Sequence, residues 1–261
     1  MVLVNMHSSA VFAAFPNILT KTTEYSIDLA TLPPCPPASP TPKPHPLPPT
    51  LNQWQDSENS GDYFSQVTPT KAGYLVWSKF PVHVYIEPPE SMSGKQSEAW
   101  VNAILPAVQE WNTYLPMDVV EKPEVADITI VRKAPPLQTS HNKILRARSA
   151  QTSYEFYTSQ NNLLSHRFTI LLSPSQIGNY LTASARHELG HALGIWGHSP
   201  LQSDALYFSQ VRNPQPISSR DVNTLKRVYE QPTSLGWSVA SLQFKSQKSK
   251  VKIEDGLGIN S

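Results

Sequence analysis

The stretch ARHELGHALGIWGHSP, residues 185–200, places three histidines, one glutamate and three glycines within sixteen positions. On an α-helix, at about 100° per residue, His187 and His191 lie one turn apart and point to the same side, with Glu188 on its flank. Apolar residues occupy the opposite side: Leu181, Ala185, Leu189, Ala192 and Leu193. The pattern predicts a helix over about 179–194 with an apolar back toward the core and a front that carries the histidines.

The spacing His-Glu-x-x-His has the chemistry of a zinc site. Two neutral imidazoles one turn apart can both reach a single zinc ion, and the carboxylate of Glu188 lies close to that ion without binding it. The same five residues also occur on ordinary helices, where His187 and His191 would be surface histidines. The residues that follow the second histidine favour the metal site.

Gly194 lies three residues beyond His191, where the helix is expected to end and the chain to reverse. A left-handed residue there costs glycine nothing and other residues about 1 kcal/mol or more. The reversal would bring His198 back toward the two helical histidines as a third ligand. Three neutral protein ligands leave the fourth position of zinc for water, as in catalytic rather than structural sites.

The segment HELGHALGIWGHS (187–199) resembles the zinc-binding motif of the metzincin metallopeptidases, His-Glu-x-x-His-x-x-Gly-x-x-His, and is most similar to their matrixin branch. Four further segments, VHVYI, AVQEWNTYLP, ADITIV and ISSRDVNTLKRVY, are similar to the matrixin order of elements over roughly 77–230. The resemblance implies a zinc-dependent endopeptidase with one catalytic Zn²⁺.

In that endopeptidase His187, His191 and His198 would bind the zinc, and Glu188 would be the general base. The resemblance also implies that a peptide or protein substrate adds a strand to the edge of the sheet, which we expect at HRFTILLS (166–173). The loop 207–217 would form one wall of the pocket for the residue after the cleaved bond.

Two positions depart from the family pattern. The third histidine would fall at 197, which is Gly197, so the sequence predicts a bulge or a positive φ there that turns His198 toward the metal. Asp204 is a rival for the third ligand, and the distant Glu230 is a further alternative. Leu206 stands where the family has a methionine in a turn below the zinc, and it keeps an apolar side chain of similar volume.

No second metal site is expected. The segment LSHRFTILLSPSQIG (164–178) lacks the clustered aspartates of the structural metal segment of matrixins, so His166 and His83 are interpreted as strand or surface histidines. Cys35 is the only cysteine, which excludes an intrachain disulfide and a thiolate zinc cage. The resemblance would allow Cys35 a latency role on the zinc, and the alternative is an idle thiol in a tail.

The chain as a whole predicts one α+β domain, a twisted mixed sheet with a long backing helix and an active-site helix, as in metzincin-like zincins. Strands are expected at 80–87, 117–121, 126–132, 149–157 and 166–173, and helices at about 97–115, 179–194 and 217–230. Ser97 is expected to cap the first helix, and Pro106 to kink it or mark its start. Residues 1–72 are interpreted as a leader and Pro-rich disordered linker, 73–235 as the peptidase domain and 236–261 as a tail.

The net charge and the length of the apolar runs indicate which partners to expect. The net charge is +1 at pH 7 and the chain has no run of 18 apolar residues, so we expect no nucleic-acid partner and no stable membrane insertion. We expect a monomer. The resemblance implies a secreted or periplasmic location, although residues 1–21 resemble a signal peptide poorly. The alternative function is a non-catalytic zinc-binding protein that keeps a metzincin-like fold, and the presence of Glu188 argues against it.

Overall fold

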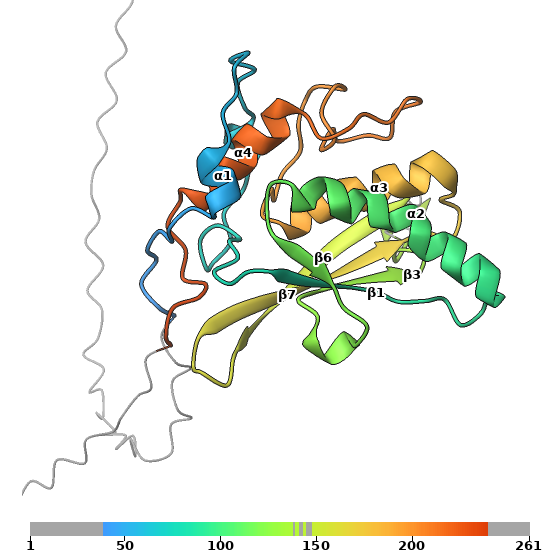
Figure 1. Cartoon of the computed structure of the whole chain (residues 1–261), viewed down its shortest axis with the longest axis horizontal. Coiled ribbons are helices and arrows are strands. Elements are labelled where there is room, and N and C mark those ends of the chain that lie inside the picture. Colours follow the sequence, from blue (N-terminus) through green and yellow to red (C-terminus); the bar gives the residue numbers. More distant parts are fainter. Residues whose placement is uncertain (1–38, 138, 141–142, 145–147, 240–261) are drawn as a thin grey trace, which may run out of the picture. The chain divides into compact units, whose positions relative to one another are not determined.

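The computed structural model describes residues 39–137, 139–140, 143–144 and 148–239, which form a mixed α/β body around a five-stranded sheet (Figure 1). The strands are β1 (Val82–Ile86), β2 (Met117–Val119), β3 (Ile128–Arg132), β4 (Thr139–Ser140), β5 (Lys143–Ile144), β6 (Ala150–Thr158) and β7 (Leu164–Leu172). The helices are α1 (Pro49–Gln53), α2 (Gly94–Asn112), α3 (Gly178–Ala192) and α4 (Ser219–Tyr229), with the 3-10 turns η2 (Phe64–Gln66) and η3 (Pro123–Val125). All five predicted strands and all three predicted helices are present, in the predicted order.

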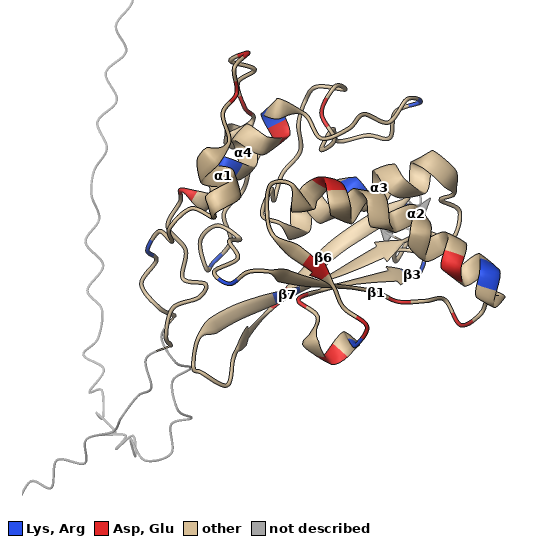
Figure 2. Cartoon of the chain, in the orientation of Figure 1, with Lys and Arg blue, Asp and Glu red and all other residues tan. Residues whose placement is uncertain are grey.

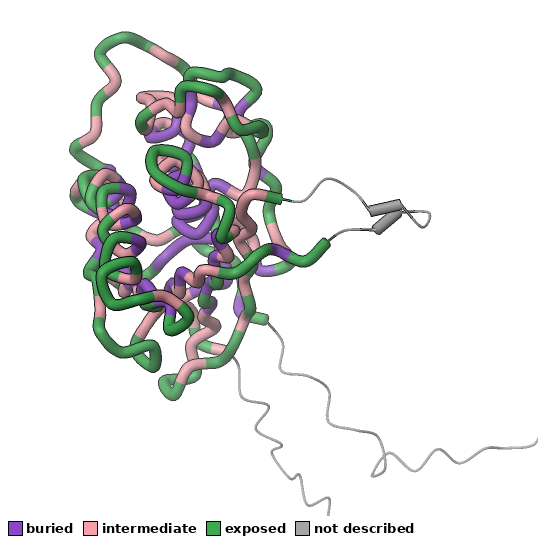
Figure 3. Tube along the Cα trace, turned by 90° about the vertical axis from the view of Figure 1, so that its right-hand side faces the viewer, coloured by how far each residue is buried: buried purple, intermediate pink, exposed green. Residues whose placement is uncertain are grey.

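The main sheet has the strand order β2-β1-β3-β7-β6, and only the β6–β7 pair is antiparallel. Its strands form because apolar residues alternate along them. In β1, Val82, Val84 and Ile86 are buried, and in β7 Phe168 and Ile170 are buried with the exposed Thr169 between them. Since side chains of a strand alternate between its two faces, this period directs one set toward the core. Figure 3 shows the buried residues gathered in the interior of the body and the exposed ones at its periphery.

The edge strand on this side of the sheet is β6, with β2 at the other edge, and not the segment 166–173 that the sequence suggested. That segment lies within β7, which pairs with β3 on one side and with β6 on the other. The register of β6 with β7 runs from Ala150 opposite Leu172 to Thr158 opposite Leu164, as in a hairpin. The sequence pattern of a hairpin does not say which of its two strands pairs with the rest of the sheet. Pairing of β7 with β3 decides this, and it leaves β6 at the edge.

Helix α2 begins earlier than predicted. Its N-cap is Ser93, which forms a capping box with Gln96, so Ser97 lies inside the first turn. The helix continues through Pro106 to Asn112. Near its end the buried Trp111 donates a hydrogen bond from Nε1 to the carbonyl oxygen of Arg186, at 2.8 Å. This bond and the surrounding core contacts hold α2 against α3, the helix that carries the histidines.

Residues 39–72 are part of the packed body, so the predicted boundary of a disordered linker at residue 72 is wrong. Leu51 is fully buried, and Tyr63 donates hydrogen bonds to α4 from its backbone N–H to Thr224 Oγ1 (3.0 Å) and from its hydroxyl to Asp221. Arg227 forms an ion pair with Asp62 at 2.8 Å. The segment is held by polar contacts to α4 as much as by apolar ones, and hydrophobic periodicity does not detect such contacts.

The packed body also extends beyond residue 235. The backbone N–H of Leu164 donates to the carbonyl oxygen of Trp237 at 2.9 Å, and the Trp237 ring stacks on His45 with centroids 4.4 Å apart. The expectations for Cys35 and for the leader before residue 39 concern residues outside the described part, as do those for the tail after residue 239. Within the described part, no helix has both the length and the apolar character needed to cross a membrane. Charges of both signs are interspersed over the elements visible in Figure 2, in keeping with the net charge of +1.

Candidate metal centre

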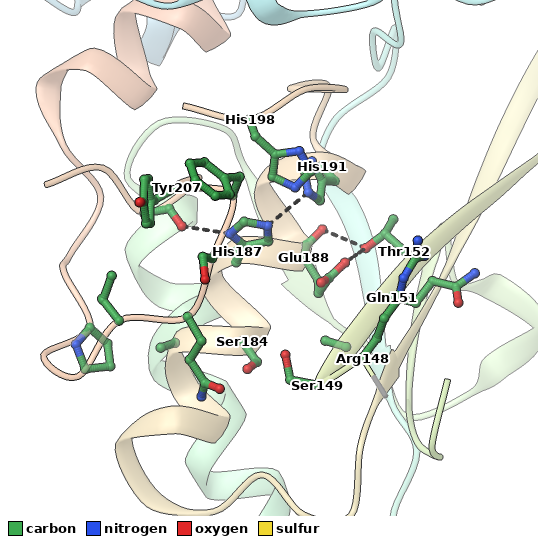
Figure 4. Close-up of a pocket in the computed structure, with 18 of the residues that line it drawn as sticks. Arg148, Ser149, Gln151, Thr152, Ser184, His187, Glu188, His191, His198 and Tyr207 are labelled. Atoms are coloured by element: carbon green, nitrogen blue, oxygen red, sulfur yellow. Dashed lines mark hydrogen bonds between the residues drawn. The ribbon is translucent and has the colours of Figure 1, made fainter. Parts of the chain in front are cut away.

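The three predicted histidines lie together. His187 and His191 project from one side of α3, and His198 approaches them from the chain that follows the helix (Figure 4). The Nε2 atoms of His187 and His191 are 3.1 Å apart. Each of the three residues offers a ring nitrogen, and these nitrogens all lie within 4.8 Å of one another. The group is therefore close enough to hold one metal ion.

Hydrogen bonds at Nδ1 of the two helical histidines determine which ring nitrogen of each is free to bind a metal. Nδ1 of His187 donates to the carbonyl oxygen of Ala205 at 2.9 Å, and Nδ1 of His191 donates to that of Ile195 at 2.7 Å. Because a carbonyl oxygen only accepts, both Nδ1 atoms carry the proton. In the neutral rings both Nε2 atoms are then unprotonated. Hydrogen bonds of this kind orient metal-binding histidines in proteins.

The short distance between these two Nε2 atoms fits a bound cation. Burial, followed by the neighbouring His187 and His198, lowers the pKa of His191 well below its ordinary value, so this ring stays neutral. The Nε2 atoms of the two rings are 3.1 Å apart, close enough for both lone pairs to be directed at a single cation. A tetrahedral zinc ion with Zn–N bonds of about 2.0–2.1 Å would place its ligand nitrogens about 3.3 Å apart. The donor set and its spacing therefore fit a divalent metal.

His198 is the more open member of the group. The residue is exposed overall. Even so, partial burial of its ring, together with the nearby His187 and Arg148, lowers its pKa to about 4. Its ring centroid lies 4.8 Å from that of His191 and 5.3 Å from that of His187. A neutral imidazole beside two others is the form that binds a metal, since a protonated ring has no free lone pair.

Gly194 produces the reversal that brings His198 back. Its φ is +132°, and a Cβ at this position would lie 2.5 Å from the carbonyl oxygen of Leu75. Its backbone N–H donates to the carbonyl of His191 at 3.1 Å, and that of Ile195 donates to Gly190 at 3.0 Å, which closes the helix. The turn also supplies the Ile195 carbonyl that accepts from His191. One glycine thus ends α3 and helps to orient a metal ligand.

Gly197 is needed for a different reason from the one predicted. It is not among the glycines with positive φ. A Cβ on Gly197 would lie 2.1 Å from the carbonyl oxygen of Gln66. Beside this close approach, the backbone N–H of Thr68 donates a hydrogen bond to the carbonyl oxygen of Trp196 at 3.0 Å. The chain before His198 therefore passes directly against residues 66–68. Close packing against this distant segment, rather than a left-handed residue, excludes a side chain at 197.

The two rival ligands lie elsewhere. Asp204 is buried, and its carboxylate accepts hydrogen bonds from Ser199, from Ser218 at 2.8 Å and from Arg220 at 3.1 Å. Glu230 is the exposed C-cap residue of α4. Neither belongs to the group of residues whose ligand atoms converge. Asp204 instead fixes the loop between His198 and α4.

Leu206 forms an apolar floor below α3. It is fully buried, and a Cβ on Gly190 would lie 2.6 Å from its side chain. The backbone N–H groups of Ala205 and Leu206 donate to the buried carboxylate of Asp221 at 2.9 and 3.4 Å. This holds the Ala205 carbonyl where His187 Nδ1 donates to it. Asp221 was missed as a site residue, and its only sequence signal was its place in the capping box with Ser218.

Glu188 lies beside the histidines and faces the edge strand. Thr152 of β6 donates from its hydroxyl to Glu188 Oε2 at 2.6 Å, and Figure 4 shows the two side chains pointing toward each other. Burial raises the pKa of Glu188, while His187, the Thr152 hydrogen bond and the charge of Arg148 act in the opposite direction. A buried carboxylate with one oxygen held in place has the properties of a general base. Thr152 was also missed, because a threonine in a strand carries no signal of this role.

A cavity of about 960 Å³ opens beside the three histidines, between α3, β6 and the loop after Asp204. Its lining includes residues 207–211 and 214–215, so the loop predicted to wall a pocket does line one. His83 and His166 lie outside it. His83 is on β1 beside Asp127, and the buried His166 on β7 stacks on Trp77 with ring centroids 4.0 Å apart. This agrees with their interpretation as strand histidines.

His166 provides a test of stability against pH. Burial lowers its pKa to about 3, against about 6.5 in an unfolded chain. The unfolded state therefore binds a proton more readily. The stability that a neutral His166 allows is present above about pH 6.5 and is lost as the pH falls toward about 3. We expect His166→Phe to reduce the slope of unfolding free energy against pH by up to about 1.4 kcal/mol per pH unit in this window.

Urea unfolding of both proteins at several pH values between about 7 and 4 measures this slope. The slope is the relevant quantity, because replacing the imidazole that stacks on Trp77 by a phenyl ring changes the absolute free energy of unfolding at every pH. Equal slopes for the parent and the variant would show that His166 is not buried in its neutral form.

No protein-family model matches this chain, and no curated protein matches it either. The converging histidines, Glu188 and the residues that orient them are therefore the basis for assigning a function.

Proposed function

We propose that the protein is a zinc-dependent endopeptidase of the metzincin class, similar to the matrixin branch. The observation that carries the proposal is the convergence of the ring nitrogens of His187, His191 and His198, with Nε2 of His187 and of His191 3.1 Å apart and the buried carboxylate of Glu188 beside them. His198 completes a set of three histidine ligands, the number of protein ligands found in catalytic zinc sites.

Each protein group has a role in peptide hydrolysis. A zinc ion bound by the three histidines supplies a Lewis acid that polarises a carbonyl and acidifies water. Glu188 accepts the proton of the attacking water and passes it to the leaving amine. Thr152 holds one oxygen of Glu188 and leaves the other free to accept that proton. Ala205 and Ile195 keep the two helical imidazoles in the tautomer with an unprotonated Nε2.

The substrate would lie along β6. Among the residues that the structure describes, this strand pairs only with β7, and it borders the cavity through Ala150, Gln151 and Thr152. The free backbone N–H and C=O groups of an edge strand can pair with an extended peptide. A peptide added there would pass over Glu188 and the three histidines, which is the geometry that hydrolysis in the middle of a chain requires.

The proposal also assigns the chain to the metzincin class. Three features support it together with the motif: the reversal at Gly194, the apolar turn of Leu206 below α3, and a sheet that ends in an antiparallel strand beside the site. Leu206 takes the place that a methionine has in the family. The swap conserves the apolar volume of the floor.

Zinc-dependent cleavage of a denatured protein tests the function. We expect the purified chain to cleave such a substrate at internal bonds, to lose this activity when a chelator removes the metal, and to regain it with added zinc. Gel electrophoresis and mass spectrometry of the fragments measure the result. A protein that binds zinc at one ion per chain and cleaves nothing would instead be the non-catalytic zinc-binding protein.

A further inference from the structure

The end of the cavity beyond His187 is surrounded by neutral polar side chains. Carboxamides come from Gln176, just before α3, and from Gln210 and Gln215 of the following loop. Hydroxyl groups come from Ser184 of α3, from Ser149 just before β6, and from Ser173 and Ser175 after β7. In Figure 4, Ser184 and Ser149 lie below His187, on the opposite side of it from His198. These residues line the same cavity as the histidines and Glu188, so under the proposed function we assign this part of the cavity to a substrate side chain next to the cleaved bond.

The carboxamides are arranged by hydrogen bonds to one another. Oε1 of Gln176 accepts from Ser184 Oγ at 3.3 Å and from Gln210 Nε2 at 3.1 Å. Nε2 of Gln215 donates to the carbonyl oxygen of Asn213 at 2.8 Å. These bonds leave the Nε2 group of Gln176 as a donor, and Oε1 of Gln210 and of Gln215 as acceptors, without a partner among the described residues. A ligand group that both accepts and donates would satisfy them.

The charges around the cavity argue against a charged side chain at this end. Glu188 and Asp204 are the two carboxylates of its lining within the described residues. Asp204 is fully engaged by Ser199, Ser218 and Arg220, and Glu188 stands at the histidines. The side chain of Arg148 extends along β6 toward Thr152, on the strand side of the cavity (Figure 4). A lysine among the glutamines would therefore have no carboxylate partner. Arg212 borders a neighbouring hollow together with Gln176 and Gln210, but it is exposed, so an ion pair of a glutamate with it would contribute little.

The same end offers some apolar surface, which a methylene chain can contact. Ala183, Val211 and Pro214 contribute to the lining next to the glutamines. A side chain with a short aliphatic stem and a carboxamide tip matches both features. Its oxygen would accept from Gln176 Nε2, and its NH₂ group would donate to Gln210 or Gln215, as amide pairs do elsewhere in proteins.

We propose that this pocket selects substrates with an uncharged polar residue, best a glutamine, directly after the cleaved bond. The proposal rests on the proposed endopeptidase function and goes further by naming the substrate class. A site built to form hydrogen bonds disfavours a ligand that leaves its polar groups unpaired. Because Gln210 is exposed and Gln176 half-buried, water softens this penalty. We expect a preference of about tenfold for glutamine over leucine in kcat/KM.

The first experiment is cleavage of a random peptide library by the zinc-loaded parent, with mass spectrometry of the products. It identifies a cleaved sequence, from which four peptides are made with glutamine, leucine, glutamate or lysine after the cleaved bond. Their kcat/KM values are compared for the parent, Gln176→Met and Gln210→Met. Gln109→Met is the matched control, since Gln109 is exposed on α2 and lies outside the cavity.

A second measurement does not depend on catalysis. Fluorescence anisotropy gives the affinity of the zinc-loaded Glu188→Gln variant for the same four peptides. The proposal expects the glutamine peptide to be cleaved fastest and bound most tightly. It expects Gln176→Met and Gln210→Met to reduce the ratio of glutamine to leucine at least threefold, and Gln109→Met to leave it unchanged.

The outcomes separate the two proposals. Preference for leucine, glutamate or lysine by the parent, or a ratio that Gln176→Met and Gln210→Met both leave unchanged, would overturn the pocket assignment while the endopeptidase function stands. If the parent cleaves no peptide, the proposed function fails. In that case the pocket assignment, which rests on the proposed function, is overturned as well.

Discussion

Replacement of Glu188 by glutamine is expected to lower kcat/KM for peptide hydrolysis by about 10²–10⁴-fold, the usual contribution of a general acid–base group. The amide keeps the shape of the side chain and still accepts a hydrogen bond from Thr152 at the oxygen that the carboxylate uses now. It cannot take up the proton of water. Zinc content is expected to stay at the parent level, because Glu188 is not one of the three converging ligands.

Stopped assays with a peptide substrate and metal analysis of the same preparations measure the two quantities. Glu230→Gln is the matched control, since this exposed glutamate at the end of α4 lies outside the cavity. Activity of Glu188→Gln close to that of the parent would contradict the role of Glu188. Loss of activity in Glu230→Gln would mean that Glu230 is required for hydrolysis, which we do not expect.

Replacement of Gly194 by alanine is expected to destabilise the fold by at least about 2 kcal/mol. The positive φ of +132° is unfavourable for alanine, and its Cβ would lie 2.5 Å from the Leu75 carbonyl, a backbone atom that a rotamer change cannot move. Relief of the clash requires the turn to shift. The shift would move the Ile195 carbonyl from His191 and carry His198 away, so zinc affinity is expected to fall with stability.

Gly178→Ala is the matched control for this change. Gly178 also has a positive φ, of +53°, but a Cβ there meets no atom within 4 Å. Its replacement should cost about 1 kcal/mol from the backbone alone. Urea unfolding and zinc titration of both variants measure the difference. Equal losses of stability in the two variants would mean that the contact with Leu75 places no constraint on the reversal.

The local part of the site was readable from the sequence. The helix, its apolar back and the pairing of His187 with His191 follow from the 3.6-residue period, which acts over neighbouring residues. The reversal at Gly194 follows from the conformation that only glycine adopts cheaply. The structure brings His198 to the other two histidines, as predicted, although Gly197 packs against Gln66 and does not have a positive φ.

The supporting residues could not be read in this way. Thr152 is 36 residues from Glu188 in the sequence, and Tyr63 is 158 residues from Asp221. A threonine in a strand or an aspartate at a helix start has many uses, and only the folded chain shows which one applies. The same holds for residues 39–72, whose many prolines suggested a linker. Bonds from Asp62 and Tyr63 to α4 tie this segment to the body.

The misassigned sheet edge has a similar origin. The sequence indicated two β-rich segments with a turn between them, which is a hairpin in the structure. Either strand of a hairpin can be the edge strand of the sheet. The alternation of apolar residues along β7 indicates that one face of the strand is buried, but it does not indicate which strand β7 pairs with. The parallel pairing of β7 with β3 places β6 at the edge beside Glu188.

The most direct test of the metal centre is a zinc titration of the metal-free parent, His198→Ala and Asp204→Asn, with metal content determined after dialysis. We expect one zinc ion per chain in the parent. His198→Ala should weaken zinc binding by at least about 100-fold, and Asp204→Asn should keep the affinity within about tenfold, since loss of a supporting hydrogen bond costs less than loss of a ligand. A parent protein that binds no zinc would contradict a site formed by these three histidines. The same holds if His198→Ala binds zinc as tightly as the parent while Asp204→Asn no longer binds it.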